Sequence, residues 1–157
     1  MKLDNAATYP SLKDRVALIT GGGSGIGASI VEGFCEQGSK VYFVDNDKRA
    51  SQDLVERFAD CGGNTPRFIC CDVRNIDELQ SVIKSIIQSS GPIRILVNNA
   101  ARDDRHSIDE VTPDYFDERI AVNMRHHFFA AQSVIEGMKS VGGGSIINMG
   151  SVSWMIG

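Results

Sequence analysis

The segment TGGGSGIG, residues 20–27, directly follows the apolar run RVALI, residues 15–19. Five of its eight residues are glycine, which loses more backbone freedom on folding than any other residue. Such a segment is useful where the chain must turn sharply or where another group must approach the backbone closely. Between a strand and a helix, it lets backbone N–H groups and the helix N-terminus hold a phosphate. We therefore predict a strand, a phosphate-binding turn and a helix in this order.

The glycines of this turn have separate predicted roles. Gly21 lets the chain turn off the strand, Gly25 lets a pyrophosphate approach, and Gly27 lets the helix pack close to the sheet. Ser24 and Ile26, which lie between these glycines, are assigned to the same nucleotide site. The alternative is a tight turn without a ligand, but the required strand and helix flank this one.

Along the rest of the chain, short apolar runs alternate with segments of helical period. The further strand candidates are residues 40–44, 67–71, 93–97 and 145–149, which are nearly uninterrupted in apolarity, as expected for strands covered on both faces. This alternation predicts an α/β fold: a Rossmann-like, doubly wound parallel sheet in three layers, α/β/α, truncated after the fifth strand. The length predicts a single domain over residues 1–157, with residues 1–13 as a surface lead-in.

Apolar residues at helical spacing predict the covering helices. The third helix has the clearest signals, because Asn75 can cap its start, Asp77 and Glu78 occupy its first turn, and Gly91 precedes a proline at its end. A fourth, longer helix is predicted over roughly residues 113–140. The apolar rows are Ile26, Ile30, Val31 and Phe34 in the first helix, Leu54, Val55 and Phe58 in the second, Ile76, Leu79, Val82, Ile83, Ile86 and Ile87 in the third, and Phe116, Ile120, Met124 and Phe128 in the fourth.

The second predicted strand ends at an acidic residue. In a dinucleotide-binding unit, an acidic residue that binds the adenosine ribose follows the glycine turn by ~20 residues. Asp45 follows Gly25 by this spacing. A carboxylate there accepts hydrogen bonds from both ribose hydroxyls and repels a 2′-phosphate, so we predict NAD as the cofactor, and not NADP. The alternative is a solvated aspartate at a strand end. Lys48 and Arg49 are expected in the first turn of the next helix.

The composition is that of an ordinary globular protein, with 42% hydrophobic and 23% charged residues. A net charge of −4 and scattered Lys and Arg argue against nucleic acid as a partner. No apolar run approaches the ~20 residues that cross a bilayer, so no membrane is expected as a partner. The N-terminal residues lack the apolar core of a signal peptide. The four cysteines have no zinc spacing, so we predict no metal site and expect a cytoplasmic location.

The glycine segment is spaced T-G-x-x-x-G-x-G, and it resembles the signature of the short-chain dehydrogenase/reductase family. Four later motifs resemble those of the same family in the same order: CDV (71–73), NNAA (98–101), VNM (122–124) and GGGSIINMGS (142–151). The fourth position of NNAA is Ala101, where the family has glycine, and alanine narrows the available backbone conformations. The resemblance covers essentially the whole chain and implies an NAD-dependent oxidoreductase.

The resemblance also assigns roles to residues of these motifs. It implies that Asp72 and Val73 meet the adenine ring, and that Asn99, Ala100 and Ala101 pass beside the cofactor ribose. It implies two catalytic residues: Ser151, whose hydroxyl hydrogen-bonds the reacting oxygen, and Asn123, which supports a chain of water molecules. The alternatives are a serine in a strand-end turn and an amide on a helix surface.

A narrower resemblance is to bacterial NAD-dependent aldose 1-dehydrogenases of the D-xylose type. It is carried by NNAARDDRH (98–106), FDERIAVNMRHHFF (116–129) and GSVSWMIG (150–157). It implies a small-molecule substrate, an aldose oxidised at C1 to the lactone, with Asp104, His106, Ser153 and Trp154 as candidate substrate-binding residues. The alternatives are a solvated charged loop for the first two and simple packing for Trp154.

The family's general base is a tyrosine in a Tyr-x-x-x-Lys motif, which is expected beyond Ser151 and after residue 157. None of Tyr9, Tyr42 and Tyr115 stands in that motif. We therefore expect this polypeptide alone to bind adenosine better than it turns over a sugar. An open fifth strand would favour aggregation or dependence on a partner.

Members of the family usually assemble through their long helices, which implies a homo-oligomer, either a dimer or a tetramer. Two other functions stay open at this point. One is a non-catalytic module that binds NAD without chemistry, which the lack of Tyr-x-x-x-Lys favours. The other is an NADPH-dependent carbonyl reductase, against which Asp45 argues.

Overall fold

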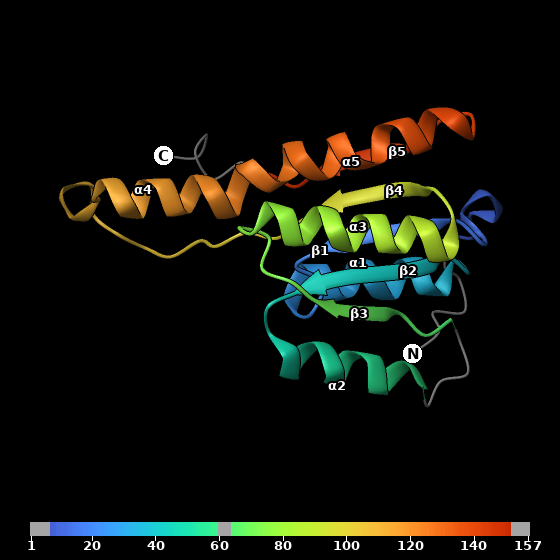
Figure 1. Ribbon diagram of the computed structural model, residues 1–157. Helices are drawn as coiled ribbons and strands as arrows, with labels where there is room; N and C mark the ends of the chain where they lie inside the picture. Colours follow the sequence, from blue (N-terminus) through green and yellow to red (C-terminus); the bar gives the residue numbers. More distant parts are fainter. Residues whose placement is uncertain (1–6, 60–63, 152–157) are drawn as a thin grey trace.

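A computed structural model describes residues 7–59 and 64–151, and its elements follow the predicted order (Figure 1). The strands are β1 (Val16–Thr20), β2 (Lys40–Asp45), β3 (Arg67–Cys70), β4 (Ile93–Asn98) and β5 (Ser145–Asn148), each within one residue of its predicted bounds. The helices are α1 (Gly25–Glu36), α2 (Lys48–Ala59), α3 (Ile76–Ser90), α4 (Pro113–Ile120) and α5 (His126–Ser140), with short helical segments η1 (Pro10–Leu12), η2 (Ile108–Glu110) and η3 (Ala121–Arg125). No helix in the described ranges combines the length and apolarity needed to cross a membrane.

The strands form one parallel sheet in the order β3-β2-β1-β4-β5. The chain builds outward from β1 in one direction and then crosses to β4 on the other side, which confirms the doubly wound topology. The last residue of β1, Thr20, pairs with Val44 of β2 and with Asn98 of β4. In such a sheet, ligands bind beyond the carboxyl ends of the strands, at the point where the order reverses.

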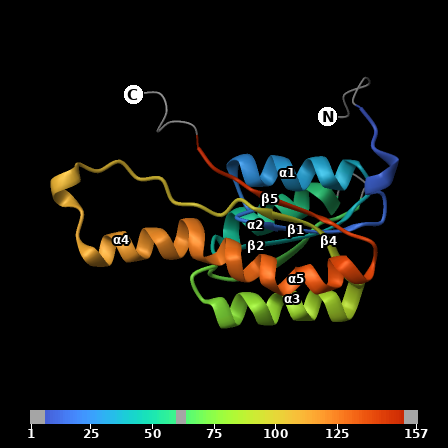
Figure 2. The ribbon, with the colours of Figure 1, turned by 90° about the horizontal axis from the view of Figure 1, so that it is seen from above.

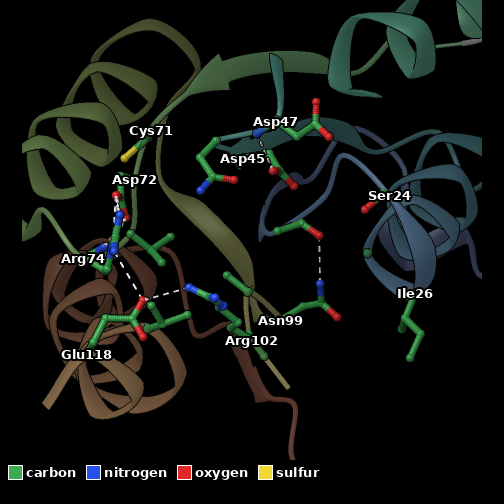
Figure 3. A pocket seen from close by; sticks show the side chains of 17 residues that line it. Ser24, Ile26, Asp45, Asp47, Cys71, Asp72, Arg74, Asn99, Arg102 and Glu118 are labelled. Carbon is green, nitrogen blue, oxygen red and sulfur yellow. Dashed lines mark hydrogen bonds and ion pairs between the residues drawn. The ribbon is translucent and has the colours of Figure 1, made fainter. Parts of the chain in front are cut away.

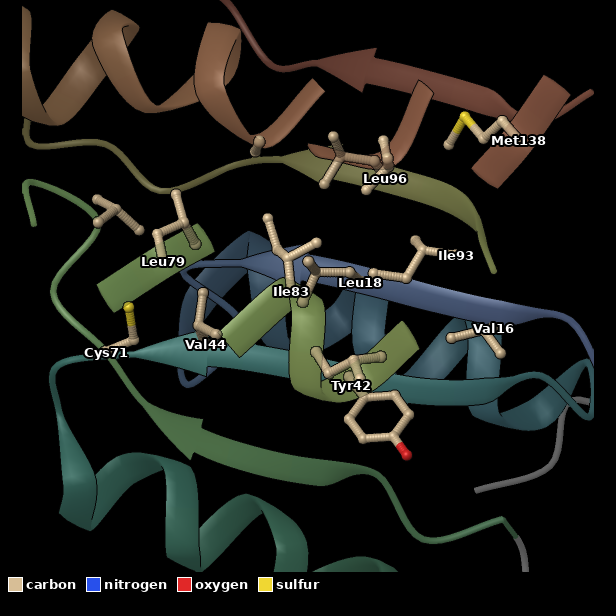
Figure 4. Packing of buried hydrophobic residues seen from close by; sticks show 14 residues of the cluster. Val16, Leu18, Tyr42, Val44, Cys71, Leu79, Ile83, Ile93, Leu96 and Met138 are labelled. Carbon is tan, nitrogen blue, oxygen red and sulfur yellow. The ribbon is translucent and has the colours of Figure 1, made fainter. Parts of the chain in front are cut away.

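Alternate residues of the strands pack on opposite faces of the sheet and make the predicted three layers. In β1, Val16 and Leu18 belong to the core under α3 and α5, whereas Ala17 and Ile19 belong to the core under α1 and α2. Figure 2 shows α1 on one side of the sheet and α3 and α5 on the other. In the α3–α5 core, drawn in Figure 4, Ile83 packs with Leu18 and is fully buried.

Helix α3 begins and ends where its sequence signals predict. The side-chain oxygen of Asn75 accepts a hydrogen bond from the Glu78 N–H at 3.2 Å, which satisfies one of the unpaired donors of the first turn. At the other end, Gly91 has a φ of +86°, a conformation that other residues rarely adopt.

The long helix differs from its prediction, because the π-helical segment η3 separates α4 from α5. The residues of η3 and α5 that face the sheet are Ala121, His126, Ala130, Val134 and Met138, so one step along this face is five residues and the others are four. The apolar row recognised in the sequence, Phe116, Ile120, Met124 and Phe128, lies outside the core and is 37–66% exposed. Helix α4 and the segment before it extend beyond the carboxyl ends of the strands (Figures 1 and 2).

Candidate functional site

A pocket of about 470 Å³ lies at the carboxyl ends of β1, β2 and β4 (Figure 3). Its volume is in the range of small-molecule sites. All the residues predicted to bind the cofactor except Gly25 line it: Gly21, Ser24, Ile26, Gly27, Asp45, Asp72, Val73, Asn99, Ala100 and Ala101. The fold therefore brings together residues from four separate segments of the sequence.

The glycine turn forms one wall, and close backbone contacts leave no room for side chains there. A Cβ atom on Gly27 would lie 1.9 Å from the carbonyl oxygen of Gly21, and one on Gly21 would lie 2.7 Å from the Cα atom of Ala100. Gly25 differs, because the space around it is open and its φ is +53°. Gly27 is thus required by packing and Gly25 by its backbone conformation. The open space in front of Gly25 is what an approaching diphosphate needs.

Helix α1 begins at this turn. Ser24 is its N-cap residue, but the Ser24 side chain makes no capping hydrogen bond, and the first helical turn carries no acidic residue. The first N–H groups of a helix have no partner within it and together carry roughly half an elementary positive charge. The turn and the helix start can therefore stabilise an anion.

Asp45 joins the glycine turn to the loop after β2. One carboxylate oxygen accepts a hydrogen bond from the Gly23 N–H, and the other accepts one from the Asp47 N–H, both at 2.9 Å. Each oxygen keeps further acceptor capacity, since an ionised carboxylate offers about four lone-pair sites. Lys48 and Arg49 lie in the first turn of α2, as predicted, and not among the residues that line the pocket.

The opposite wall is a set of ion pairs that the sequence did not predict (Figure 3). Arg74 donates hydrogen bonds to both carboxylate oxygens of Asp72 and also reaches Glu118 of α4 at 3.3 Å. Arg102 approaches the same glutamate at 3.6 Å. The hydrogen bonds from Arg74 hold the pKa of Asp72 below its ordinary value. Arg74 and Arg102 directly follow the CDV and NNAA motifs, which is the signal that could have found them, whereas Glu118 lies in the segment FDERIAVNMRHHFF (116–129) without a spacing that assigns it to the pocket.

Asn99 ties the end of β4 to the glycine turn. Its side-chain nitrogen donates to the carbonyl oxygens of Thr20 at 3.2 Å and Gly21 at 2.9 Å. The Thr20 hydroxyl oxygen accepts hydrogen bonds from the backbone N–H groups of Asn99 and Ala100, both at 3.0 Å. Ala101, where the family pattern has glycine, is not in the left-handed region, so alanine brings no backbone strain at this position.

The two predicted catalytic residues lie outside this lining. Asn123 is in η3, and its side chain makes two hydrogen bonds to the backbone of Arg102. The Asn123 side-chain oxygen accepts from the Arg102 N–H at 2.8 Å, and the Asn123 side-chain nitrogen donates to the Arg102 carbonyl oxygen at 3.1 Å. Ser151 is exposed and follows β5. A hydrogen bond of 2.8 Å between the side chains of Asn98 and Asn148 joins the carboxyl ends of β4 and β5, and Ser151 follows three residues after this end of β5.

The predicted substrate residues after β4 contact α4 and do not line the pocket. Asp104 pairs with Arg119 at 2.7 Å, and Nδ1 of His106 lies 2.8 Å from the Tyr115 hydroxyl. Ser153 and Trp154 fall outside the described residues. Within residues 7–59 and 64–151, no group of three or more His, Cys, Asp or Glu side chains is placed to hold a metal ion.

Comparison with known proteins places these features in a wider context. The family model for short chain dehydrogenases matches residues 15–156. A probable galactose dehydrogenase, GalD, of Rhizobium meliloti (strain 1021) is 44% identical over 151 residues, which are 96% of this chain and 59% of that protein. D-xylose 1-dehydrogenase of Caulobacter vibrioides (strain NA1000 / CB15N) is 45% identical over 155 residues, 98% of this chain and 60% of that protein.

The solved structures include similar folds. The structure of ligand-free aldohexose dehydrogenase (AldT) of Thermoplasma acidophilum superposes on this chain with a TM-score of 0.79 at 30% sequence identity. The match covers 92% of this chain and 52% of the aldohexose dehydrogenase chain. The chain described here therefore spans about 60% of the length of the curated relatives that it matches.

Proposed function

The chain belongs to the short-chain dehydrogenase family, and from this premise we propose that the protein binds NAD and oxidises a CH–OH group, C1 of an aldose such as D-xylose, to the lactone. Enzymes of this family use nicotinamide cofactors, which accept a hydride from the carbon being oxidised. The observation that carries the proposal is the pairing of the glycine turn with Asp45. The turn can hold a diphosphate, and the carboxylate is fixed 2.9 Å from the Gly23 N–H on the same side of the pocket.

Each wall of the pocket is proposed to bind a different part of the cofactor. The glycine turn and the start of α1 hold the diphosphate by their N–H groups. The carboxylate of Asp45 accepts hydrogen bonds from the hydroxyls of the adenosine ribose. The other residues proposed to contact the cofactor are Ser24 and Ile26 beside the diphosphate, Asp72 and Val73 at the adenine ring, and Asn99, Ala100 and Ala101 beside the second ribose.

The preference for NAD rests on charge at one end of the pocket. Asp45 and Asp47 both line it there. The arginines that line it, Arg74 and Arg102, pair with acidic side chains of the opposite wall. A 2′-phosphate beside Asp45 would meet a carboxylate, and like charges in a partly enclosed site repel more than they do in bulk water.

Substitution of Asp45 tests this preference. In Asp45→Asn the affinity for NAD is expected to fall about 10- to 100-fold, because a charged hydrogen-bond acceptor contributes about 1.5–3 kcal/mol. The affinity for NADP should fall less or rise, since the repulsive charge is removed. Calorimetric titration with both dinucleotides measures this ratio. Asp47→Asn is the control, because it removes a charge from the same pocket and leaves Asp45 in place. An unchanged affinity for NAD in Asp45→Asn would contradict the choice of cofactor.

The proposed substrate class rests on the sugar dehydrogenases among the relatives. Ser151 would donate a hydrogen bond to the reacting oxygen, as a fixed donor stabilises developing negative charge. Asn123 would hold the Arg102 backbone and support the water chain. Asp104, His106, Ser153 and Trp154 are the residues proposed to bind the sugar hydroxyls or stack on the ring.

An absorbance assay for NADH with a panel of pentoses and hexoses tests this part of the proposal. We expect reduction of NAD with at least one aldose. Tight NAD binding without turnover of any sugar or alcohol would instead favour a non-catalytic NAD-binding module. Faster oxidation of NADPH with a carbonyl compound would favour a carbonyl reductase.

We also propose that the protein forms a homo-oligomer through the outer face of α4, η3 and α5. The apolar row Phe116, Ile120, Met124 and Phe128 lies there, and Phe128 is 66% exposed. Apolar side chains that gather on a surface mark interaction sites more often than isolated ones do.

A change at Phe128 should separate the subunits. Phe128→Ser is expected to shift the sedimentation coefficient toward that of a monomer at micromolar concentration, because it removes a large apolar group from the proposed interface. Ile108→Ser is the matched control, since Ile108 is 93% exposed but belongs to η2 and not to that row. Equal sedimentation of both variants and the unmodified protein would count against this interface.

A further inference from the structure

His126 is a polar side chain in the core beside the candidate site. It is the first residue of α5, and both it and Thr20 are completely buried. Its Nε2 atom lies 3.2 Å from the Thr20 hydroxyl oxygen. Thr20 ends β1 immediately before the glycine turn, so this contact joins the long helix to the first strand across 106 residues of sequence.

The π-helical segment explains why a histidine reaches this position. Ala121 faces the sheet, and a regular helix would bring Arg125 to the same face four residues later. Instead, Arg125 is exposed, and His126 is buried at a step of five residues, which is the repeat of a π-helical hydrogen bond. The segment therefore turns the helix so that the imidazole faces the sheet.

Counting donors and acceptors fixes the direction of the hydrogen bond between the two side chains. A threonine hydroxyl has one proton and two lone pairs. The Thr20 oxygen accepts from the N–H groups of Asn99 and Ala100, which uses both lone pairs. Its single proton is therefore directed at His126, and Nε2 must be the unprotonated acceptor. Burial agrees with a neutral ring, because it lowers the pKa of His126 to about 4.

This arrangement acts on the wall of the pocket. Asn99 and Ala100 both line the pocket, and their N–H groups are held by the Thr20 oxygen. If nothing accepted the Thr20 proton, the hydroxyl would turn toward another acceptor, and at least one of these two N–H groups would lose its partner. An unpaired buried polar group costs about 1–3 kcal/mol, so such a loss is enough to displace the loop.

We propose that His126 is a positioning residue of the dinucleotide site: its unprotonated Nε2 accepts the Thr20 proton and thereby keeps the backbone of Asn99 and Ala100 in the shape that receives the cofactor. The inference rests on the proposed function, because it assigns the pocket to a dinucleotide. It adds a residue that contacts neither the cofactor nor the substrate and acts through Thr20.

Two variants of the native protein test this role. His126→Leu has a side chain of similar volume but no acceptor, and His126→Gln offers a side-chain oxygen that can accept the Thr20 proton. We expect NAD affinity to fall about tenfold or more in His126→Leu and to return to within about threefold of the unmodified protein in His126→Gln. The amide NMR signals of Asn99 and Ala100 should shift in the leucine variant and return in the glutamine variant. A role in stability alone would lower the melting temperature without this difference in binding.

The ¹⁵N signals of the imidazole provide a test that needs no substitution. They should show Nδ1 protonated and Nε2 unprotonated at pH 7, and a protonated Nε2 would overturn the inference even if a variant failed to fold. Equal NAD affinity in the unmodified protein and folded His126→Leu would also overturn it, while leaving the proposed function intact. Failure of the unmodified protein to bind NAD would overturn the proposed function, and with it the assignment of His126 to a dinucleotide site.

Discussion

Alanine at position 27 is expected to destabilise the protein by roughly 3 kcal/mol or more, at the upper end of the cost of overpacking a core. The added methyl group would lie 1.9 Å from the carbonyl oxygen of Gly21 and 2.6 Å from Nδ2 of Asn99. The first contact is with backbone, which cannot rotate away, so α1 must move off the sheet or the turn must open. Either change also breaks the hydrogen bond from Asn99 to Gly21. The melting temperature should fall by roughly 10 °C, and dinucleotide binding should be lost.

The same helix offers a matched control. Gly33 is an exposed glycine of α1 with ordinary backbone angles, and a Cβ atom there would meet nothing within 4 Å. Gly33→Ala should therefore raise the free energy of unfolding by about 1 kcal/mol, the usual gain in an exposed helix. A pair of thermal denaturation curves decides the matter. If Gly27→Ala melted near the unmodified protein, the close packing of the turn would be refuted.

Local signals were sufficient to predict most of the fold. The strands are short, apolar and parallel, so their bounds follow from the limits of the apolar runs in the sequence. For this reason β5 was predicted as readily as β1. The cap at Asn75 was predicted because it depends on residues only three apart. The glycine turn and Asp45 were predicted to share a site because Asp45 follows Gly25 by the ~20 residues that separate these two elements in a dinucleotide-binding unit.

The parts that the sequence did not predict depend on distant contacts. Glu118 lies at the pocket and forms an ion pair with Arg74, which is 44 residues earlier in the chain. An ion pair between two partly exposed side chains leaves no periodic pattern in the sequence. The long helix shows a second limit. Its apolar row repeats every four residues, but the face that packs on the sheet contains His126 and includes one step of five. A search for apolar periodicity therefore selected the exposed face.

Mild acid is expected to weaken the folded state through His126. Burial lowers the pKa of His126 from 6.5 to about 4, with a smaller contribution from His127, while the Val122 backbone opposes the shift. Between these values, the unfolded chain binds a proton that the folded chain does not. The contribution of the neutral ring to stability is therefore complete above pH 6.5 and is lost as the pH falls toward 4. It amounts to roughly 3 kcal/mol, since one pKa unit corresponds to about 1.4 kcal/mol.

Urea denaturation at a series of pH values measures this loss, and His126→Gln isolates it. Glutamine does not titrate, so the free energy of unfolding of that variant should change much less between pH 6.5 and 4. A smaller slope should remain in the variant, because burial also lowers the pKa of His127. Asp72 does not interfere in this window: its pKa is lowered below 3.8, so its contribution is lost only at lower pH. Equal slopes in the variant and the unmodified protein would show that His126 is not held neutral in the core.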